Sequence, residues 1–342
     1  MKKFIKIMLQ GSFSPHPSRA TWMDVILRYN KPNHLKSIWQ IVNSVGPYVL
    51  LWILMVQSLE ISYWLTLLLS IFAAGFLVRI FIIFHDCVHG SFFKSKRLNT
   101  ICGVILGALA FTPFHRWQNE HLTHHRTVGN LDKRGIGDVK TLTVEEYQNC
   151  SKWQRFKYHF YRHPIFLFGM APILLFLLKY RFTSRDMSWK MRYQTYLTNF
   201  ILLLIYGLLV WRLGWKVVVL IQLPILYISA VHGVWLFYVQ HQFEGVVWTR
   251  TAEWNYQTMA IKGSSFFKLP AVLKWFTGNI GFHHIHHLSP IIPNYNLEQC
   301  HNENEMFRSV KPLTFWLAFK TIRLRLWDEK RQRLVRFKDV KG

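Results

Sequence analysis

The chain has 342 residues, of which 51% are hydrophobic and 16% are aromatic, and it carries a formal net charge of +25. This combination is expected of a membrane protein with basic surfaces that attract anionic lipid headgroups and acidic proteins. The basic residues lie mainly between and beyond the apolar runs and form no reading helix, so we exclude a nucleic-acid-binding protein.

The N-terminal residues 1–36 are mixed and basic. Prolines at positions 15, 17 and 32 break any long helix there, so we expect a cytosolic segment with a short surface helix. Lys6 interrupts the first apolar stretch and no small-residue cleavage site follows, which argues against a signal peptide.

Four apolar runs are predicted to be membrane-spanning helices. Each has about 20 residues, which is enough to cross a hydrocarbon core at about 1.5 Å per residue. Arg79 lies near the end of the second run, from where its side chain can reach the membrane interface. The predicted spans are 38–57, 61–84, 196–213 and 217–239.

Two shorter apolar runs, 101–114 and 165–178, are predicted to be interfacial or re-entrant. A helix of about 14 residues reaches only about 21 Å, which is too short to span. Counting both runs as spans gives an alternative of six. The connection 57–61 holds no Lys or Arg and the turn 212–216 holds only two, so the basic segments are expected to face the cytosol.

Histidines gather in three places along the chain. The pattern His-x-x-His-His occurs at 121–125 and again at 283–287, and a further pair follows the second apolar run. On a helix, positions i, i+3 and i+4 share one face, so each cluster can direct its imidazoles to one point. The eight residues are His85, His89, His121, His124, His125, His283, His286 and His287. They exceed the need of one metal ion and indicate a two-metal centre on the cytosolic side.

The types of ligand residue in the chain limit which metals and metal cofactors it can bind. Imidazole suits zinc, copper, iron and nickel, but a structural zinc site closes with four ligands. Haem in a bundle needs single facing histidines rather than crowded clusters. The cysteines Cys87, Cys102, Cys150 and Cys300 form no Cys-x-x-Cys pair, which disfavours a zinc ribbon or an iron–sulfur cluster, and we expect reduced thiols.

Four segments carry a resemblance to a known family. They are 84–90 (FHDCVHG), 130–138 (NLDKRGIGD), 234–241 (VWLFYVQH) and 278–290 (GNIGFHHIHHLSP). With the order of the clusters and the runs between them, the chain resembles the integral-membrane fatty-acid desaturases, and most closely the bacterial acyl-lipid Δ5 desaturases. The resemblance implies one all-α membrane domain over 1–342, with four spans, interfacial helices and a cytosolic helical cap that includes the catalytic segments 85–160 and 240–342.

The resemblance also implies a reaction. It predicts two iron ions, molecular oxygen as co-substrate and a cis double bond inserted into an acyl chain of a membrane lipid, at the bacterial cell membrane. The substrate supplies half of the electrons that reduce oxygen to water, so a separate acidic carrier, ferredoxin or flavodoxin, must supply the rest. Related desaturases carry an extra histidine after the last span, which makes His241 a ninth expected ligand.

Several other residues have competing interpretations. Asp86 and Glu120 either orient neighbouring imidazoles or are interfacial charges. His284 is excluded from the ligands because it has no counterpart in the first cluster, and His232 is expected to be a packing residue. Asp132 and Asp138 are expected to fix a loop. The remaining histidines, His115, His159, His163 and His301, are expected to be structural or exposed.

Two other functions stay open at this point. A membrane hydroxylase uses the same iron scaffold and differs only in its product, an alcohol instead of an alkene. A membrane metal transporter should place metal-binding groups near the middle of its spans, where only His232 lies.

Overall fold

The structure, a computed structural model, describes residues 18–340. The expectation about a signal peptide concerns residues outside this range. The first described helix is α2 (Ser18–Tyr29), which agrees with a short helix ahead of the first span.

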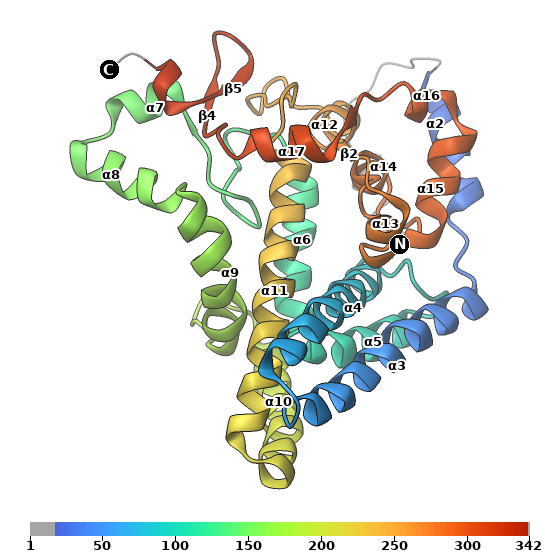
Figure 1. Ribbon diagram of the computed structural model, residues 1–342. Helices are drawn as coiled ribbons and strands as arrows, with labels where there is room; N and C mark the ends of the chain where they lie inside the picture. Colours follow the sequence, from blue (N-terminus) through green and yellow to red (C-terminus); the bar gives the residue numbers. More distant parts are fainter. Residues whose placement is uncertain (1–17, 341–342) are drawn as a thin grey trace.

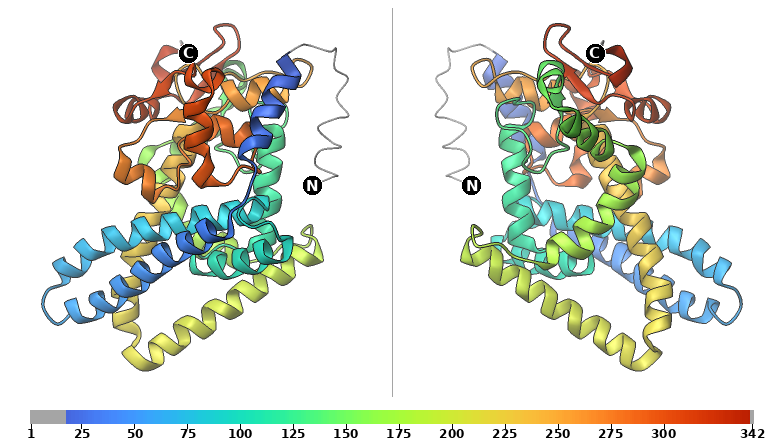
Figure 2. Two further views of the ribbon diagram at one scale, coloured as in Figure 1. Left: turned by 90° about the vertical axis from the view of Figure 1, so that its right-hand side faces the viewer. Right: turned by 90° about the vertical axis from the view of Figure 1, so that its left-hand side faces the viewer.

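Four long helices form the membrane part, and all four are long and apolar enough to cross a bilayer. They form two helix hairpins of consecutive helices, which lie below a cap of short elements (Figures 1 and 2). The helical fold with four candidate spans is therefore confirmed. Three of the helices include the whole run predicted for them, and the second helix begins two residues after its predicted start at residue 61. Their bounds are α3 (His34–Ser58), α4 (Tyr63–His89), α10 (Trp189–Leu213) and α11 (Trp215–His241).

Helix α4 is the centre of the bundle, packed against α3, α5 and α11. It continues past the predicted end at residue 84 and stops at His89, because Gly90 adopts a left-handed conformation with φ of 71°. Phe84 is fully buried, and its ring packs against the rings of Phe114 and Trp117 in α6 (Phe114–Thr127). The last turn of α4 is thereby held rigidly, and it carries two of the histidines.

Two bent helix pairs replace the short apolar runs. Helices α5 (Lys96–Leu109) and α6 (Phe114–Thr127) meet at 100°, and α8 (Lys152–Tyr161) meets the irregular helix 165–181 at 52°. Each pair is a broken span or a re-entrant loop, which keeps the six-span alternative open. The sharp bend after α5 turns α6 toward the cap (Figure 1), where the ring of His124 on α6 meets the rings of Phe237 and His241 on α11.

The irregular helix consists of four short pieces. They are η1 (Ile165–Met170), α9 (Ala171–Ile173), η2 (Leu174–Leu178) and η3 (Lys179–Arg181).

The cap holds short helices and two small sheets. One sheet has the order β1-β4-β5, with Leu142 opposite Leu326 and Leu326 opposite Val335; in the other, β2 and β3 are parallel. The strands are β1 (Leu142–Thr143), β2 (Phe266–Phe267), β3 (Pro312–Leu313), β4 (Leu326–Asp328) and β5 (Arg333–Val335). The helices are α7 (Val144–Asn149), α12 (Tyr256–Lys262), α13 (Ala271–Phe276), α14 (His283–Leu288), α15 (Asn294–Glu303), α16 (Glu305–Arg308), α17 (Phe315–Thr321) and η4 (Phe337–Asp339).

A buried arginine joins this cap to the membrane part. Arg162 is 1% exposed and donates hydrogen bonds to the Thr141 hydroxyl (3.0 Å), the Gln242 amide oxygen (3.2 Å) and the Leu324 carbonyl (3.0 Å). These bonds connect the segment before β1, the end of α11 and the C-terminal sheet. The end of α11 is therefore fixed to the cap at the residue after His241.

Candidate metal centre

The structure brings the nine predicted histidines together at the junction of the bundle and the cap. Four helices supply them: α4 and α11 from the membrane part, α6 from the bent pair and α14 from the cap. They form two groups, and in each group the nitrogen atoms that could bind a metal all lie within 4.8 Å of one another. The five-histidine group is His85, His89, His121, His125 and His286, and the four-histidine group is His124, His241, His283 and His287.

The five-histidine group is held by close contacts between Nε2 atoms. The His121 Nε2 lies 2.9 Å from His89 Nε2 and 3.0 Å from His125 Nε2. The His286 Nε2 lies 3.0 Å from His125 Nε2. The indole of Trp117 stacks on His121 with ring centres 4.2 Å apart, which fixes that imidazole from outside.

The Nε2 atoms of the four-histidine group also lie close together. The His241 Nε2 lies 3.1 Å from His124 Nε2 and 3.0 Å from His283 Nε2. The His287 Nε2 lies 3.1 Å from His283 Nε2. Each His-x-x-His-His motif is therefore divided: the outer pair, four residues apart, belongs to one group and the middle histidine belongs to the other.

This arrangement fits metal ions better than hydrogen bonding. A neutral imidazole has one N–H and one lone pair, so several Nε2 atoms that meet about 3 Å apart cannot all be satisfied by their own protons. The Nε2 of His85 is buried and has no hydrogen-bond partner. A cation about 2.1 Å from each nitrogen would hold neighbouring ligand atoms about 3 Å apart and satisfy every lone pair.

The protonation state favours metal binding as well. Burial, followed by the charges of neighbouring histidines, lowers the pKa of His283, His286 and His287 well below the usual value. These imidazoles are therefore neutral near pH 7, with lone pairs available to a cation.

A buried network orients His85 from behind. Asp86 Oδ1 lies 3.2 Å from His85 Nδ1, and Asp86 Oδ2 accepts hydrogen bonds from Asn294 N (2.7 Å) and Nδ2 (2.9 Å). Asn294 also accepts from the Gln40 amide at 2.8 Å. Of the two interpretations of Asp86, the structure favours the orienting one. Glu120 pairs with Arg116 at 3.5 Å and accepts a hydrogen bond from the Tyr180 hydroxyl at 3.2 Å, which favours the interpretation as an interfacial charge.

A second carboxylate has an orienting position that the sequence did not predict. Asp138 Oδ1 lies 2.5 Å from His124 Nδ1, and both side chains are buried. The expectation that Asp138 only fixes a loop is therefore wrong, whereas Asp132 does fix one, by accepting from Thr251 N at 2.8 Å and pairing with Arg250. The Gly263 carbonyl plays the corresponding part for His241, 3.1 Å from its Nδ1.

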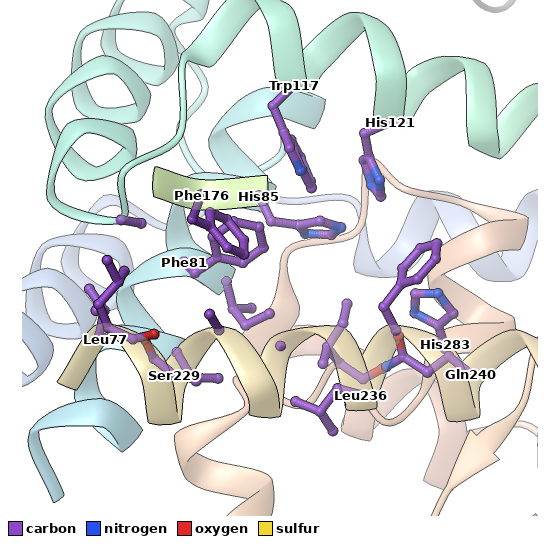
Figure 3. A pocket seen from close by; sticks show the side chains of 18 residues that line it. Leu77, Phe81, His85, Trp117, His121, Phe176, Ser229, Leu236, Gln240 and His283 are labelled. Carbon is purple, nitrogen blue, oxygen red and sulfur yellow. The ribbon is translucent and has the colours of Figure 1, made fainter. Parts of the chain in front are cut away.

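A narrow apolar cavity leads to the histidines from inside the bundle. It lies between α4 and α11, has a volume of about 680 Å³ including its open mouth, and has Leu77 and Ser229 at one end. At the other end it meets His85 and His121 of the five-histidine group and His283 of the four-histidine group (Figure 3). A chain of methylenes in this cavity would lie against both groups.

Comparisons with known proteins decide the family. The fatty acid desaturase family model matches residues 62–316. A fatty acid desaturase of Bacillus subtilis (strain 168) is 45% identical over 316 residues, which are 92% of this chain and 90% of that protein. This chain belongs to the fatty acid desaturase family. The prediction of a fatty acid desaturase from the histidine clusters and the four segments is thereby confirmed.

More distant relatives are named acyl-lipid desaturases. The sn-1 acyl-lipid omega-3 desaturase (ferredoxin) of Nostoc sp. (strain 36) is 28% identical over 64% of this chain and 61% of its own length. The sn-1 oleoyl-lipid 12-desaturase of Picosynechococcus sp. is 26% identical over 71% of this chain and 70% of its own length.

The histidines that were not predicted to be metal ligands lie outside both histidine groups in this desaturase. His284 is fully buried and faces His301 and Phe307, away from the metal centre. His232 is exposed on α11, and its Nδ1 lies 2.7 Å from the Ile228 carbonyl. Two others make local hydrogen bonds. His115 bonds to the Gln118 side chain, and His163 accepts a hydrogen bond from the backbone N–H of Ile165.

We expect Asp138→Asn to weaken metal binding about 10- to 100-fold, the usual effect of losing a carboxylate that orients a ligand histidine. The affected ion should be the one held by the four-histidine group, which contains His124. Titration of metal-loaded protein with a chelator measures the effect. Asp132→Asn is the matched control, since it removes an exposed carboxylate from the same segment; equal metal loss in both variants would contradict the assigned role.

Proposed function

We propose that this desaturase holds one iron ion in each histidine group and uses molecular oxygen to insert a cis double bond into an acyl chain of a membrane lipid. Bound there, the iron pair would supply the oxidising power that removes hydrogen from an unactivated methylene. The chain's own residues hold the imidazoles in position, keep water away and direct the substrate to the centre.

The apolar cavity is the observation that carries this proposal. Its walls come from α4 and α11, and its inner end is formed by imidazoles of both groups. Such a cavity suits a hydrocarbon chain, because a long apolar ligand is bound mainly by burial of its surface. The donor set, nine imidazoles in two groups, agrees with iron but is also compatible with other transition metals.

The position of the double bond, the electron donor, the side of the membrane and the domain organisation are each supported by a different observation. The Δ5 position is supported by the resemblance of the four sequence segments. An acidic donor, ferredoxin or flavodoxin, is supported by the charge of +25 and by relatives named as ferredoxin-dependent. The distribution of basic residues supports a centre on the cytosolic side of the bacterial cell membrane, and the continuity of contacts between bundle and cap supports one domain over 1–342.

Product analysis tests the reaction. A host without its own desaturase, expressing this chain, should accumulate fatty acids with one new cis double bond, and gas chromatography–mass spectrometry of derivatised esters should place it at Δ5. Active protein should contain about two irons, one for each group. An alcohol as product would identify a hydroxylase, and activity with zinc alone would contradict the iron centre.

A further inference from the structure

A second cavity lies beside the start of α3, where α13 and α15 of the cap approach the membrane helices. Its volume is about 880 Å³ including the open solvent at its mouth. It shares no lining residue with the apolar cavity between α4 and α11, which we call the acyl cavity. The segment around Gly278 separates the two: Asn279 lines this second cavity, and Ile280 lines the acyl cavity. We call it the interfacial cavity.

The most unusual wall residue of the interfacial cavity is Arg79. It is 6% exposed within α4, and among residues 18–340 no carboxylate lies within ion-pair distance of it. Its guanidinium stacks on the Trp275 ring at 3.9 Å and donates to two neutral oxygens, the Ser44 hydroxyl (3.1 Å) and the Trp275 carbonyl. A charge buried in a membrane helix without a counter-ion is costly, so this position favours an external anion.

One unpaired lysine adds to the positive charge of the interfacial cavity. Lys36 is exposed and lies over the Tyr295 ring at 5.7 Å. Lys274 pairs with Glu298, the one carboxylate that lines the cavity. Lys36 and Arg79 are therefore left without acidic partners in its wall, and each can attract the negative charge of a phosphate diester.

The surroundings place the interfacial cavity at the depth of lipid headgroups. Trp39 lines it and is 65% exposed, and Trp275 lines it and is 39% exposed. Val272 on α13 is 67% exposed, so this short helix presents an apolar surface next to the basic cavity. Tryptophan at the rim and cations inside are typical of the membrane–water interface.

We propose that the interfacial cavity is a binding site for the phosphate of an anionic membrane phospholipid, separate from the acyl substrate site. Lys36 and Arg79 bind the phosphate, and Trp39 and Trp275 flank its glycerol backbone. The site also adjoins the metal centre, because Gln40 and Asn294 line it and continue to Asp86 and His85. A bound lipid would brace the network that orients His85.

Native mass spectrometry of the delipidated full-length protein tests this site without using activity. Dioleoyl phosphatidylglycerol should bind at roughly tenfold lower concentration than dioleoyl phosphatidylcholine, since only the first has a net negative headgroup. Lys36→Gln should weaken phosphatidylglycerol binding about fivefold, the effect expected for one cation beside a lipid phosphate. Arg79→Gln should weaken it further, because its charge is buried.

The matched control is Lys96→Gln, which removes an exposed lysine outside the cavity and should leave lipid binding unchanged. Arg79→Gln is interpreted only if it stays monodisperse; otherwise the exposed Lys36 decides the test. Unchanged phosphatidylglycerol binding in Lys36→Gln, or equal binding of the two lipids, would overturn the proposal. Displacement of the lipid by inorganic phosphate alone would show a phosphate site and overturn its assignment to a lipid.

Discussion

Replacing His283 by glutamine should abolish desaturation and lower the iron content from about two ions to about one per chain. His283 Nε2 contacts two other members of the four-histidine group, His241 at 3.0 Å and His287 at 3.1 Å. Removing it leaves three imidazoles there, while the five-histidine group keeps all its members. Metal analysis and product analysis of the same preparation measure both effects.

The neighbouring histidine provides the matched control. His284 is equally buried but faces His301 and Phe307, so His284→Gln should retain both irons and most of the activity. Melting temperatures of both variants separate loss of metal from loss of fold. Iron loss in His284→Gln with normal iron in His283→Gln would show that the assignment of the third cluster is shifted by one residue.

The sequence predicted the composition of the centre because its information is local. A helix places positions i, i+3 and i+4 on one face, so the ligand candidates within each cluster follow from spacing alone. The four spans follow in the same way from run length, with ends displaced by a few residues because helices α4 and α11 continue through His89 and His241 into the cap.

The division of the histidines into two groups could not be predicted from spacing. It depends on how the four helices α4, α6, α11 and α14 are placed in the fold, which puts His124 in the group of His241 and His286 in the group of His85 and His89. The orienting residues were missed for a related reason. Asp138 lies 14 residues after His124 in a loop, and Asn294 meets Asp86 across 208 positions of sequence. Such contacts are set by tertiary packing, which leaves no periodic signal.

Filling the acyl cavity should stop the reaction without disturbing the metal centre. Gly233 lies on α11 and lines the cavity, and a Cβ atom added there would have no other atom within 4 Å. Gly233→Phe therefore introduces a ring into open space rather than into the backbone. Phenylalanine also suits a helix interior better than glycine, by a few tenths of a kcal/mol, so the helix should persist.

We expect Gly233→Phe to lower desaturation by roughly tenfold or more, because a misplaced acyl chain no longer presents its methylene to the centre. Iron content should stay at about two ions, since no imidazole is touched. Gly207→Phe is the matched control: Gly207 is exposed on α10, lies outside the cavity and has the same open surroundings. Full activity in Gly233→Phe, or equal loss in both variants, would mean that the substrate reaches the histidines by a route other than the cavity between α4 and α11.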